Sequence, residues 1–178
     1  MQDELVERPE FKPVLGTILY TLVVPGSITV LVPYLLLNLR FHLIPMRLGN
    51  YRYLGLLPLL LGLFCYFWGA WDFTFVGKGT PSPISPPKVL VVRGLYRYVR
   101  NPIYLGILLV LAGEALFFQE LILVVYAGLF FLSFNRYVVN NEEPMLRRNF
   151  GANYKLYCHA IPRWLPKIKI GKMIISGG

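Results

Sequence analysis

Charged side chains are scarce in this sequence. Asp, Glu, Lys and Arg make up 15% of its 178 residues, whereas 56% of the residues are hydrophobic. Soluble domains carry about 25% charged residues, so this chain is too apolar to hide its hydrophobic side chains in one soluble core. The composition therefore predicts an integral membrane protein.

Cysteine and histidine are also rare. The two cysteines, Cys65 and Cys158, have neither a disulfide nor a metal-site spacing, and the only histidines, His42 and His159, stand alone. We therefore expect no disulfide and no metal centre. A secretory signal is not expected either, because residues 1–10 carry four acidic side chains and the apolar run after them is long enough to span a membrane.

What the sequence does contain is long runs without charge. Residues 14–37 and 53–71 contain no charged side chain, and each run can cross a hydrocarbon core of about 30 Å as a helix. A third apolar block, residues 102–137, is too long for one crossing and is interrupted near residue 119. We interpret this block as a tight helical hairpin, so the predicted fold is all-α with about four transmembrane helices.

Two kinds of residue stand out within these runs. Glu114 lies in the first arm of the hairpin, where a carboxylate faces a polar partner or a wet cavity, or snorkels to water. Small residues, Gly55 and Gly62 in the second run and Gly106 and Gly113 in the third, allow helices to approach closely. The contact can lie within one chain or between two copies, so the oligomeric state stays open.

Basic residues gather on one side of the predicted topology. Four crossings place the N-terminal tail, the loop of residues 72–101 and the C-terminal tail together, and these segments hold 15 of the 18 Lys and Arg residues. The positive-inside rule then predicts that this loop and the C-terminal tail are cytoplasmic. Contact with anionic membrane lipids accounts for the net charge of +9, so no nucleic-acid partner is expected.

The predicted cytoplasmic loop leads into a basic helix start. Residues 77–87, GKGTPSPISPP, are rich in proline and glycine, which favours an extended loop, and residues 88–92, KVLVV, can continue it in extended form. Asn101 and Pro102 then supply a capping residue and a first-turn proline. An anionic group would find backbone N–H donors at this helix start, beside Arg100.

The C-terminal tail supplies the opposite charge. Glu142 and Glu143 follow the last predicted span, and we expect Pro144 to restart the chain as an amphipathic helix over residues 144–160. The apolar side chains of that helix are expected to face the membrane. They are Met145, Leu146, Phe150, Tyr154 and Tyr157.

A ligand with both charges would explain why acids lie opposite a basic helix start. In S-adenosylmethionine the carboxylate suits Arg100, the ammonium or ribose hydroxyls suit a glutamate, and the sulfonium suits an aromatic face through cation–π attraction. Candidate aromatic faces are Tyr96, Tyr98 and Tyr104. Other zwitterionic or nucleotide ligands fit these residue types too, so the residues alone leave the ligand open.

Three segments of the C-terminal half resemble the isoprenylcysteine carboxyl methyltransferase and phospholipid methyltransferase superfamily of integral membrane enzymes. They are GLYRYVRNPIYLG at 94–106, EEPMLRRNFGANYKLY at 142–157 and IPRWLP at 161–166. Their order and spacing match the family pattern of Gly-x-Tyr, Arg-His-Pro-x-Tyr, Glu-Glu, Phe-Gly-x-x-Tyr-x-x-Tyr and a Pro-Arg-rich end. The resemblance implies that residues 76–178 form the cofactor-binding core, after an N-terminal part of residues 1–75.

By this resemblance the cofactor is S-adenosylmethionine and the product is S-adenosylhomocysteine. The implied cofactor-binding residues are Lys88, Val89, Leu90, Val91, Tyr96, Arg100, Asn101, Pro102, Ile103, Tyr104, Glu142 and Glu143. One position departs from the pattern, because the usual histidine is Asn101 here. Asparagine can cap a helix and form hydrogen bonds, but it cannot act as a general base.

The implied reaction is methyl transfer to a lipophilic acceptor that arrives sideways from the bilayer, with Glu142 and Arg136 as candidate catalytic residues. Without an obvious base, an acceptor already ionised at neutral pH is favoured, such as the carboxylate of a prenylated cysteine. Arg136 would anchor that carboxylate or snorkel to lipid phosphate. Methylation of a phospholipid amine or a small thiol uses the same cofactor frame.

Two functions other than methyl transfer stay open. The charge clusters can be topological anchors of a non-catalytic membrane scaffold or lipid-binding protein. A similar C-terminal motif also occurs in the membrane sterol reductases, which use a nicotinamide cofactor, although this chain is short for their larger set of helices.

Overall fold

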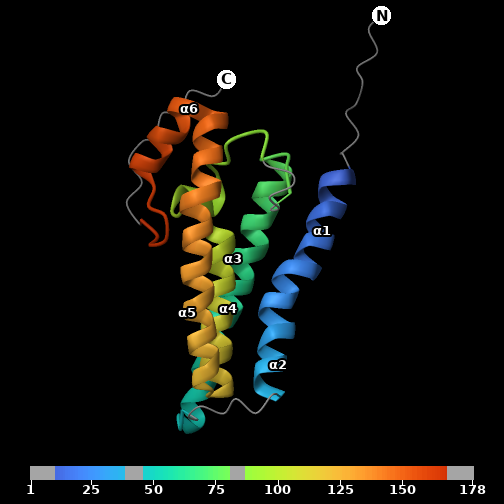
Figure 1. Ribbon diagram of the computed structural model, residues 1–178, viewed down its shortest axis with the longest axis vertical. Coiled ribbons are helices and arrows are strands. Elements are labelled where there is room, and N and C mark those ends of the chain that lie inside the picture. Colours follow the sequence, from blue (N-terminus) through green and yellow to red (C-terminus); the bar gives the residue numbers. More distant parts are fainter. Residues whose placement is uncertain (1–10, 39–45, 81–86, 168–178) are drawn as a thin grey trace, which may run out of the picture.

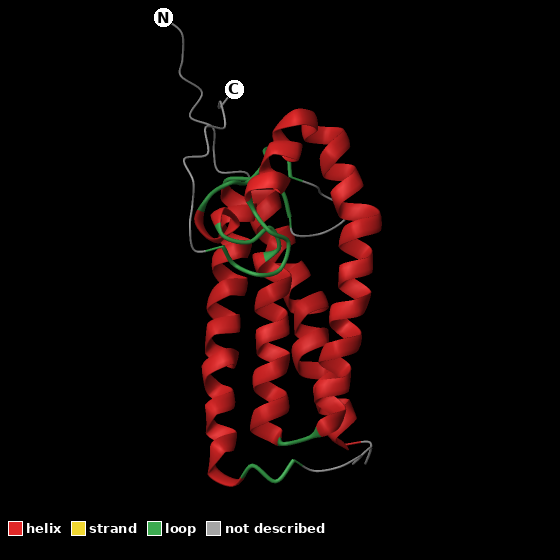
Figure 2. Ribbon diagram, turned by 90° about the vertical axis from the view of Figure 1, so that its left-hand side faces the viewer, coloured by secondary structure: helices red, strands yellow, loops and turns green. Residues whose placement is uncertain are grey.

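The computed structural model describes residues 11–38, 46–80 and 87–167, and within these ranges the chain forms helices and loops without strands (Figure 2). The predicted tail at 1–10, His42 and residues 81–86 of the predicted extended loop lie outside the described residues. Short 3₁₀ turns cover Gly49–Gly55 and Gly94–Arg97, and π-helical turns cover Ser27–Leu31 and Val138–Glu142. The longer helices are α1 (Phe11–Gly26), α2 (Val32–Asn38), α3 (Leu56–Phe75), α4 (Pro102–Phe118), α5 (Leu121–Tyr137) and α6 (Glu143–Ala160).

Three helical stretches are long and apolar enough to cross a membrane. They are Val14–Asn38, Gly49–Phe75 and Leu121–Ala160, and the shorter apolar helix α4 lies among them. The third stretch has 40 residues, about twice what a crossing needs, so we take α5 as its spanning part and α6 as the part beyond the bilayer. The chain is thus an all-α integral membrane protein, as its composition predicts.

One end of the helix bundle carries a cap. Residues 87–101 and α6 lie together there, and α1 begins at the same end (Figure 1). We call this the capped end. At the opposite end α4 and α5 form the predicted tight hairpin, in which Gln119 adopts a left-handed conformation with φ of 60°. The backbone carbonyl of Gln119 accepts a hydrogen bond from Met46 N at 2.7 Å, which ties a preceding segment to the hairpin tip.

Helix α3 and the turn before it pack against α4 through glycines spaced seven residues apart. A Cβ on Gly62 would lie 2.6 Å from the carbonyl oxygen of Gly106, and a Cβ on Gly113 would lie 2.6 Å from that of Gly55. Such distances are shorter than any real Cβ contact, so the two backbones approach this closely only because these positions lack a side chain. The glycines that stand out in the sequence therefore serve packing within one chain.

Helix α1 attaches to the bundle along a face of hydroxyl groups. The hydroxyls of Thr17 and Thr74 lie 2.8 Å apart, as do those of Thr21 and Tyr66. Further along, the carbonyl of Ile28, in the π-helical turn, accepts a hydrogen bond from the Tyr126 hydroxyl at 2.9 Å. Hydrogen bonds of this kind join helices inside a membrane, where apolar surface alone gives little specificity.

Helix α6 covers the range predicted for the C-terminal amphipathic helix, but Pro144 does not interrupt the chain before it. Helix α5 continues through the π-helical turn Val138–Glu142 directly into α6. Pro144 is tolerated because it lies in the first turn of α6, where its missing N–H is not needed. The chain bends instead at Gly151, whose φ of 52° and ψ of −122° suit only glycine. Figure 1 shows α6 first extending α5 and then turning back down beside it at the capped end.

The prediction that the apolar stripe of α6 faces the membrane was wrong. Tyr154 and Tyr157 are 2% and 3% exposed, and they pack with Ile161 against Leu90 and Val92 of the preceding loop. Periodicity locates an apolar face on a helix, but it does not say what covers that face. Here the loop of residues 87–101 covers it.

Candidate active site

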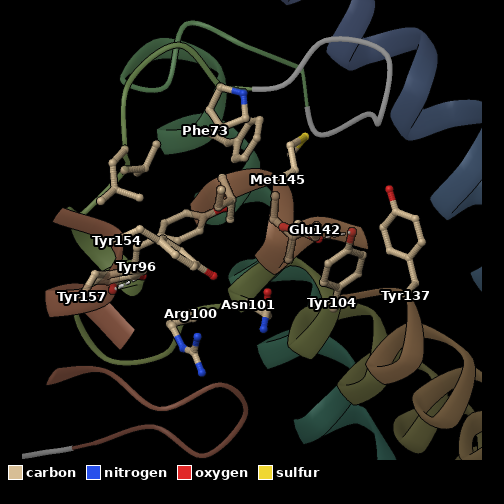
Figure 3. Close-up of a pocket in the computed structure, with 15 residues that line it drawn as sticks. Phe73, Tyr96, Arg100, Asn101, Tyr104, Tyr137, Glu142, Met145, Tyr154 and Tyr157 are labelled. Carbon is tan, nitrogen blue, oxygen red and sulfur yellow. Dashed lines mark hydrogen bonds between the residues drawn. The ribbon is translucent and has the colours of Figure 1, made fainter. Parts of the chain in front are cut away.

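A pocket lies at the capped end, between the start of α4, the loop of residues 87–101 and α6 (Figure 3). About 880 Å³ of space lies inside the pocket and at its open mouth together. Its lining residues are Phe73, Pro87, Leu90, Val91, Tyr96, Arg100, Asn101, Ile103, Tyr104, Tyr137, Glu142, Met145, Leu146, Tyr154 and Tyr157.

Most of the residues predicted to bind a cofactor come together in this lining. Those that line the pocket are Leu90, Val91, Tyr96, Arg100, Asn101, Ile103, Tyr104 and Glu142. Lys88 and Val89 are exposed, whereas Pro102 and Glu143 are buried beside the pocket without lining it. Arg136 is exposed near the end of α5 and does not line the pocket.

The loop brings Tyr96 to the pocket through a turn that requires glycine. Gly94 has a φ of 53°, and a Cβ at this position would collide with the carboxylate of Asp72 on α3. The 3₁₀ turn Gly94–Arg97 follows, and the hydroxyl of Tyr157 donates to the Tyr96 carbonyl at 2.8 Å. The loop is thus fixed between α3 and α6.

Glu142 is the acid that faces the pocket. It ends the π-helical turn after α5, beyond the membrane-spanning segment, and the Tyr104 hydroxyl donates to its Oε2 at 3.0 Å. Burial, aided by the nearby charge of Glu143, raises the pKa of Glu142 to about 7, although the hydrogen bond from Tyr104 acts in the opposite direction. Near neutral pH this carboxyl group can therefore both release and accept a proton.

Glu143 instead forms the centre of a buried ion-pair cluster. Its Oε1 accepts hydrogen bonds from Arg100 Nη1 at 3.0 Å and from Arg163 Nε at 2.7 Å, and its Oε2 accepts a second bond from Arg163 at 3.0 Å. Arg147 approaches Oε2 from the surface at 3.6 Å. The acids of the tail do face the basic start of α4, as the sequence suggests, but Glu143 is the one that pairs with Arg100.

Residues 161–167, which we call the C-terminal strap, are fastened to the start of α4. Arg100 N donates to the Pro162 carbonyl at 2.9 Å, and Lys167 N donates to the Tyr98 carbonyl at 3.0 Å. Asn101 holds the N-cap position, but its side chain does not cap the helix as predicted. Its Nδ2 donates to the Arg163 carbonyl at 3.2 Å instead, so it joins the strap to the pocket wall.

Buried tyrosines form one wall of the pocket. Tyr96, Tyr154 and Tyr157 are each less than 10% exposed, and burial raises the pKa of all three well above the ordinary value. Their hydroxyls therefore stay neutral at physiological pH. The wall offers aromatic faces and uncharged polar groups, a combination suited to a flat heterocycle or to a cation.

Sequence reasoning missed seven of the lining residues. The Tyr-x-x-Tyr spacing on one helical face pointed to Tyr154 and Tyr157, but those side chains were assigned to the membrane. Phe73 and Tyr137 lie at the ends of apolar spans, where no local pattern separates a pocket residue from a lipid-facing one. The missed residues are Phe73, Pro87, Tyr137, Met145, Leu146, Tyr154 and Tyr157.

The polar groups of the pocket leave one donor without an acceptor. Arg100 Nε is buried and has no hydrogen-bond partner within the described part of the chain. An anionic group of a ligand would supply the acceptor, while Glu142 would attract a cationic group. No cluster of three His, Cys, Asp or Glu side chains able to hold a metal occurs among residues 11–38, 46–80 and 87–167.

Comparison with known proteins identifies the family. A family model described as phospholipid methyltransferase matches residues 51–153, a range that runs from the turn before α3 into α6 and includes Arg100, Tyr104 and Glu142. Neither the search of curated proteins nor the search of solved structures finds a match. The family match covers more than half of the chain, and the protein therefore belongs to the phospholipid methyltransferase family.

Proposed function

We propose that the protein transfers a methyl group from S-adenosylmethionine to the amino group of a phospholipid. Family membership supports methyl transfer to a lipid-related acceptor. The choice of a phospholipid amine as acceptor depends on one observation. The carboxyl group of Glu142, held by a hydrogen bond from Tyr104, lies in the pocket and has a raised pKa.

The pocket residues fit this cofactor. Arg100 Nε, buried without a partner among the described residues, can donate to its carboxylate. The wall of Tyr96, Tyr154 and Tyr157 can hold the adenine ring or the sulfonium, and the carboxylate of Glu142 attracts the cationic end. When bound, S-adenosylmethionine supplies an electrophilic methyl group on sulfur.

An amine acceptor needs a base, and Glu142 can act as one. The ammonium form of a phospholipid amine has no lone pair, so it must lose a proton before its nitrogen can attack a methyl group. With a pKa of about 7, the ionised carboxylate of Glu142 can accept that proton, which leaves a neutral amine. Nitrogen then forms the bond to the methyl carbon as the carbon–sulfur bond breaks, and the methylated ammonium and a neutral thioether result.

The surrounding residues position these groups. The Tyr104 hydroxyl holds Glu142 Oε2, and Glu143, itself paired with Arg163, holds the guanidinium of Arg100. Alignment of nucleophile, methyl carbon and leaving sulfur accounts for much of the rate in such a transfer. Access of the cofactor from the cytoplasm follows if the capped end is cytoplasmic, as the distribution of basic residues predicts.

A carboxylate acceptor, such as that of a prenylated cysteine, is the alternative. It is favoured by Arg100, a cation in the pocket lining, and it needs no base. The role predicted for Arg136 as an anchor of that carboxylate stays a prediction, because its side chain is exposed outside the pocket.

The test is a comparison of acceptors. Purified protein with S-adenosylmethionine would be offered vesicles that contain phosphatidylethanolamine or a prenylated cysteine analogue, and lipid products would be followed by mass spectrometry. We expect N-methylated phosphatidylethanolamine and one S-adenosylhomocysteine per methyl group. Methylation of the prenylcysteine carboxylate alone would contradict the amine assignment and favour the alternative.

A further inference from the structure

The hydroxyl face of α1 directs one further side chain toward the pocket. Thr17 and Thr21, one helical turn apart, both bond to α3, so this face of α1 points into the bundle. Tyr20 lies three residues after Thr17 and adjacent to Thr21, on the same side of the helix. Its side chain is half-buried, whereas its neighbours Leu19 and Leu22 are 55% and 68% exposed.

Some neighbours of Tyr20 line the pocket, although Tyr20 itself does not. Its phenol group is near enough to Tyr66, Tyr137 and Glu142 to interact with them electrostatically, and Tyr104 is near enough to interact with Tyr20. In Figure 3 Tyr137 lies at the side of the pocket where α1 runs. Tyr20 is thus near the side of the pocket that Tyr137 and Glu142 line, and not part of the wall formed by Tyr96, Tyr154 and Tyr157.

Next to this side, the rings of Tyr104 on α4 and of Phe134 and Phe130 on α5 lie in a row. The rings of Tyr104 and Phe134 are 5.1 Å apart, and those of Phe134 and Phe130 are 4.3 Å apart. Phe130 is buried in the bundle core, whereas Phe134 is half-buried, so a lipid acceptor would reach Glu142 beside Phe134 and Tyr104. Helix α1 lies outside the range matched by the family, residues 51–153, so it can differ between family members that share the cofactor site.

We propose that Tyr20 is a specificity-determining residue that contacts the headgroup of the methyl acceptor at the membrane side of the pocket. This inference rests on the proposed methyl transfer, but it assigns acceptor selection to a residue of the first helix. Tyr20 completes a group of three tyrosines with Tyr104 and Tyr137 around Glu142. Its hydroxyl and ring would hold the acceptor nitrogen beside the carboxylate without touching the cofactor.

The test separates acceptor binding from cofactor binding. Tyr20→Leu and Tyr20→Phe would be compared with Tyr34→Leu, a matched control because Tyr34 lies on the same long helical stretch with 61% exposure. The KM for phosphatidylethanolamine in vesicles and the Kd for S-adenosylmethionine would be measured for each variant. Tyr20→Leu should raise the acceptor KM about tenfold, the scale of one lost aromatic or polar contact, with cofactor Kd within about twofold of wild type. Tyr20→Phe should give a smaller increase.

The outcomes distinguish this inference from the function on which it rests. Wild-type protein that fails to bind S-adenosylmethionine would overturn the proposed function and this inference together. Normal cofactor binding with Tyr20→Leu and Tyr20→Phe kinetics equal to those of Tyr34→Leu would overturn this inference alone. A loss of cofactor affinity as large as the rise in acceptor KM would also overturn it, because Tyr20 would then act on the cofactor side. If Tyr20→Leu does not fold, Tyr20→Phe decides.

Discussion

At the scale of single residues, two adjacent glutamates have separate surroundings. Glu142 faces the pocket and Tyr104, whereas Glu143 lies among Arg100, Arg163 and Arg147. Successive side chains on a helix point about 100° apart, so neighbours in sequence face different parts of the molecule. The sequence shows that two acids stand at this position, but their division between pocket and ion-pair cluster depends on the path of α6 and the strap.

Glu142→Gln is expected to stabilise the protein more at pH 8 than at pH 5. The pKa of Glu142 is about 7 in the folded protein, raised from 4.5 mainly by burial, so the folded state retains a proton that the unfolded chain releases between these values. The free energy of unfolding contributed by this group therefore falls as pH rises through that window. Glutamine does not titrate and avoids the loss. Thermal unfolding of both proteins in detergent at the two pH values measures the effect, and an equal difference at both would contradict it.

Glu143→Gln should destabilise the fold strongly, because it leaves Arg100 and Arg163 with a buried charge that is no longer neutralised. Removal of one partner from a buried ion pair costs about 3–5 kcal/mol. Arg147→Gln is the matched control, since Arg147 lies at 3.6 Å from the same carboxylate with a side chain that is 58% exposed, and an exposed pair contributes at most about 1 kcal/mol. The thermal unfolding midpoint should fall far more for Glu143→Gln than for Arg147→Gln. Equal shifts would show that the ion pairs of Glu143 do not stabilise the fold.

At the scale of elements, the sequence predicts the spans well and their contacts poorly. Uncharged runs locate α1 with α2 and α3, because only an apolar surface is stable in lipid, and the polar break at Gln119 locates the hairpin. Pro144 misleads, since a proline after a wide π-helical turn does not end a helix. The glycines of α3 and α4 are visible in the sequence, but whether they meet each other or a second copy depends on tertiary packing.

Gly62→Ala tests this close helix contact. Its new Cβ would lie 2.6 Å from a backbone oxygen of Gly106, which cannot move aside like a flexible side chain, and overpacking of this kind costs about 1–3 kcal/mol. Gly128→Ala on α5 is the matched control, since nothing lies within 4 Å of its Cβ position and alanine favours a helix by up to about 1 kcal/mol. Thermal unfolding should be lowered by the first change and unaffected or raised by the second. The reverse order would contradict the packing of α3 on α4.

At the scale of the whole molecule, the pocket combines segments that are far apart in the sequence. Phe73 comes from α3, Leu90 and Tyr96 from the loop, and Tyr104 and Tyr154 from α4 and α6. Motif spacing predicts the residues near the start of α4 and Glu142, because each motif is local. It cannot predict the contribution of Phe73 or Tyr137, which depends on how the spans pack. The division of the chain at residue 75 and the cytoplasmic orientation of the capped end stay predictions.

The central claim is that the pocket at the capped end binds S-adenosylmethionine. Calorimetric titration of the purified protein in detergent tests it most directly, with S-adenosylhomocysteine as second ligand, Glu142→Gln as the pocket variant and Glu114→Gln as a matched acid outside the pocket. We predict micromolar binding that weakens at least about tenfold in Glu142→Gln, the loss of roughly one charge-assisted contact, and that is unchanged in Glu114→Gln. Well-folded wild-type protein that binds neither ligand, or equal losses in the two variants, would contradict the account.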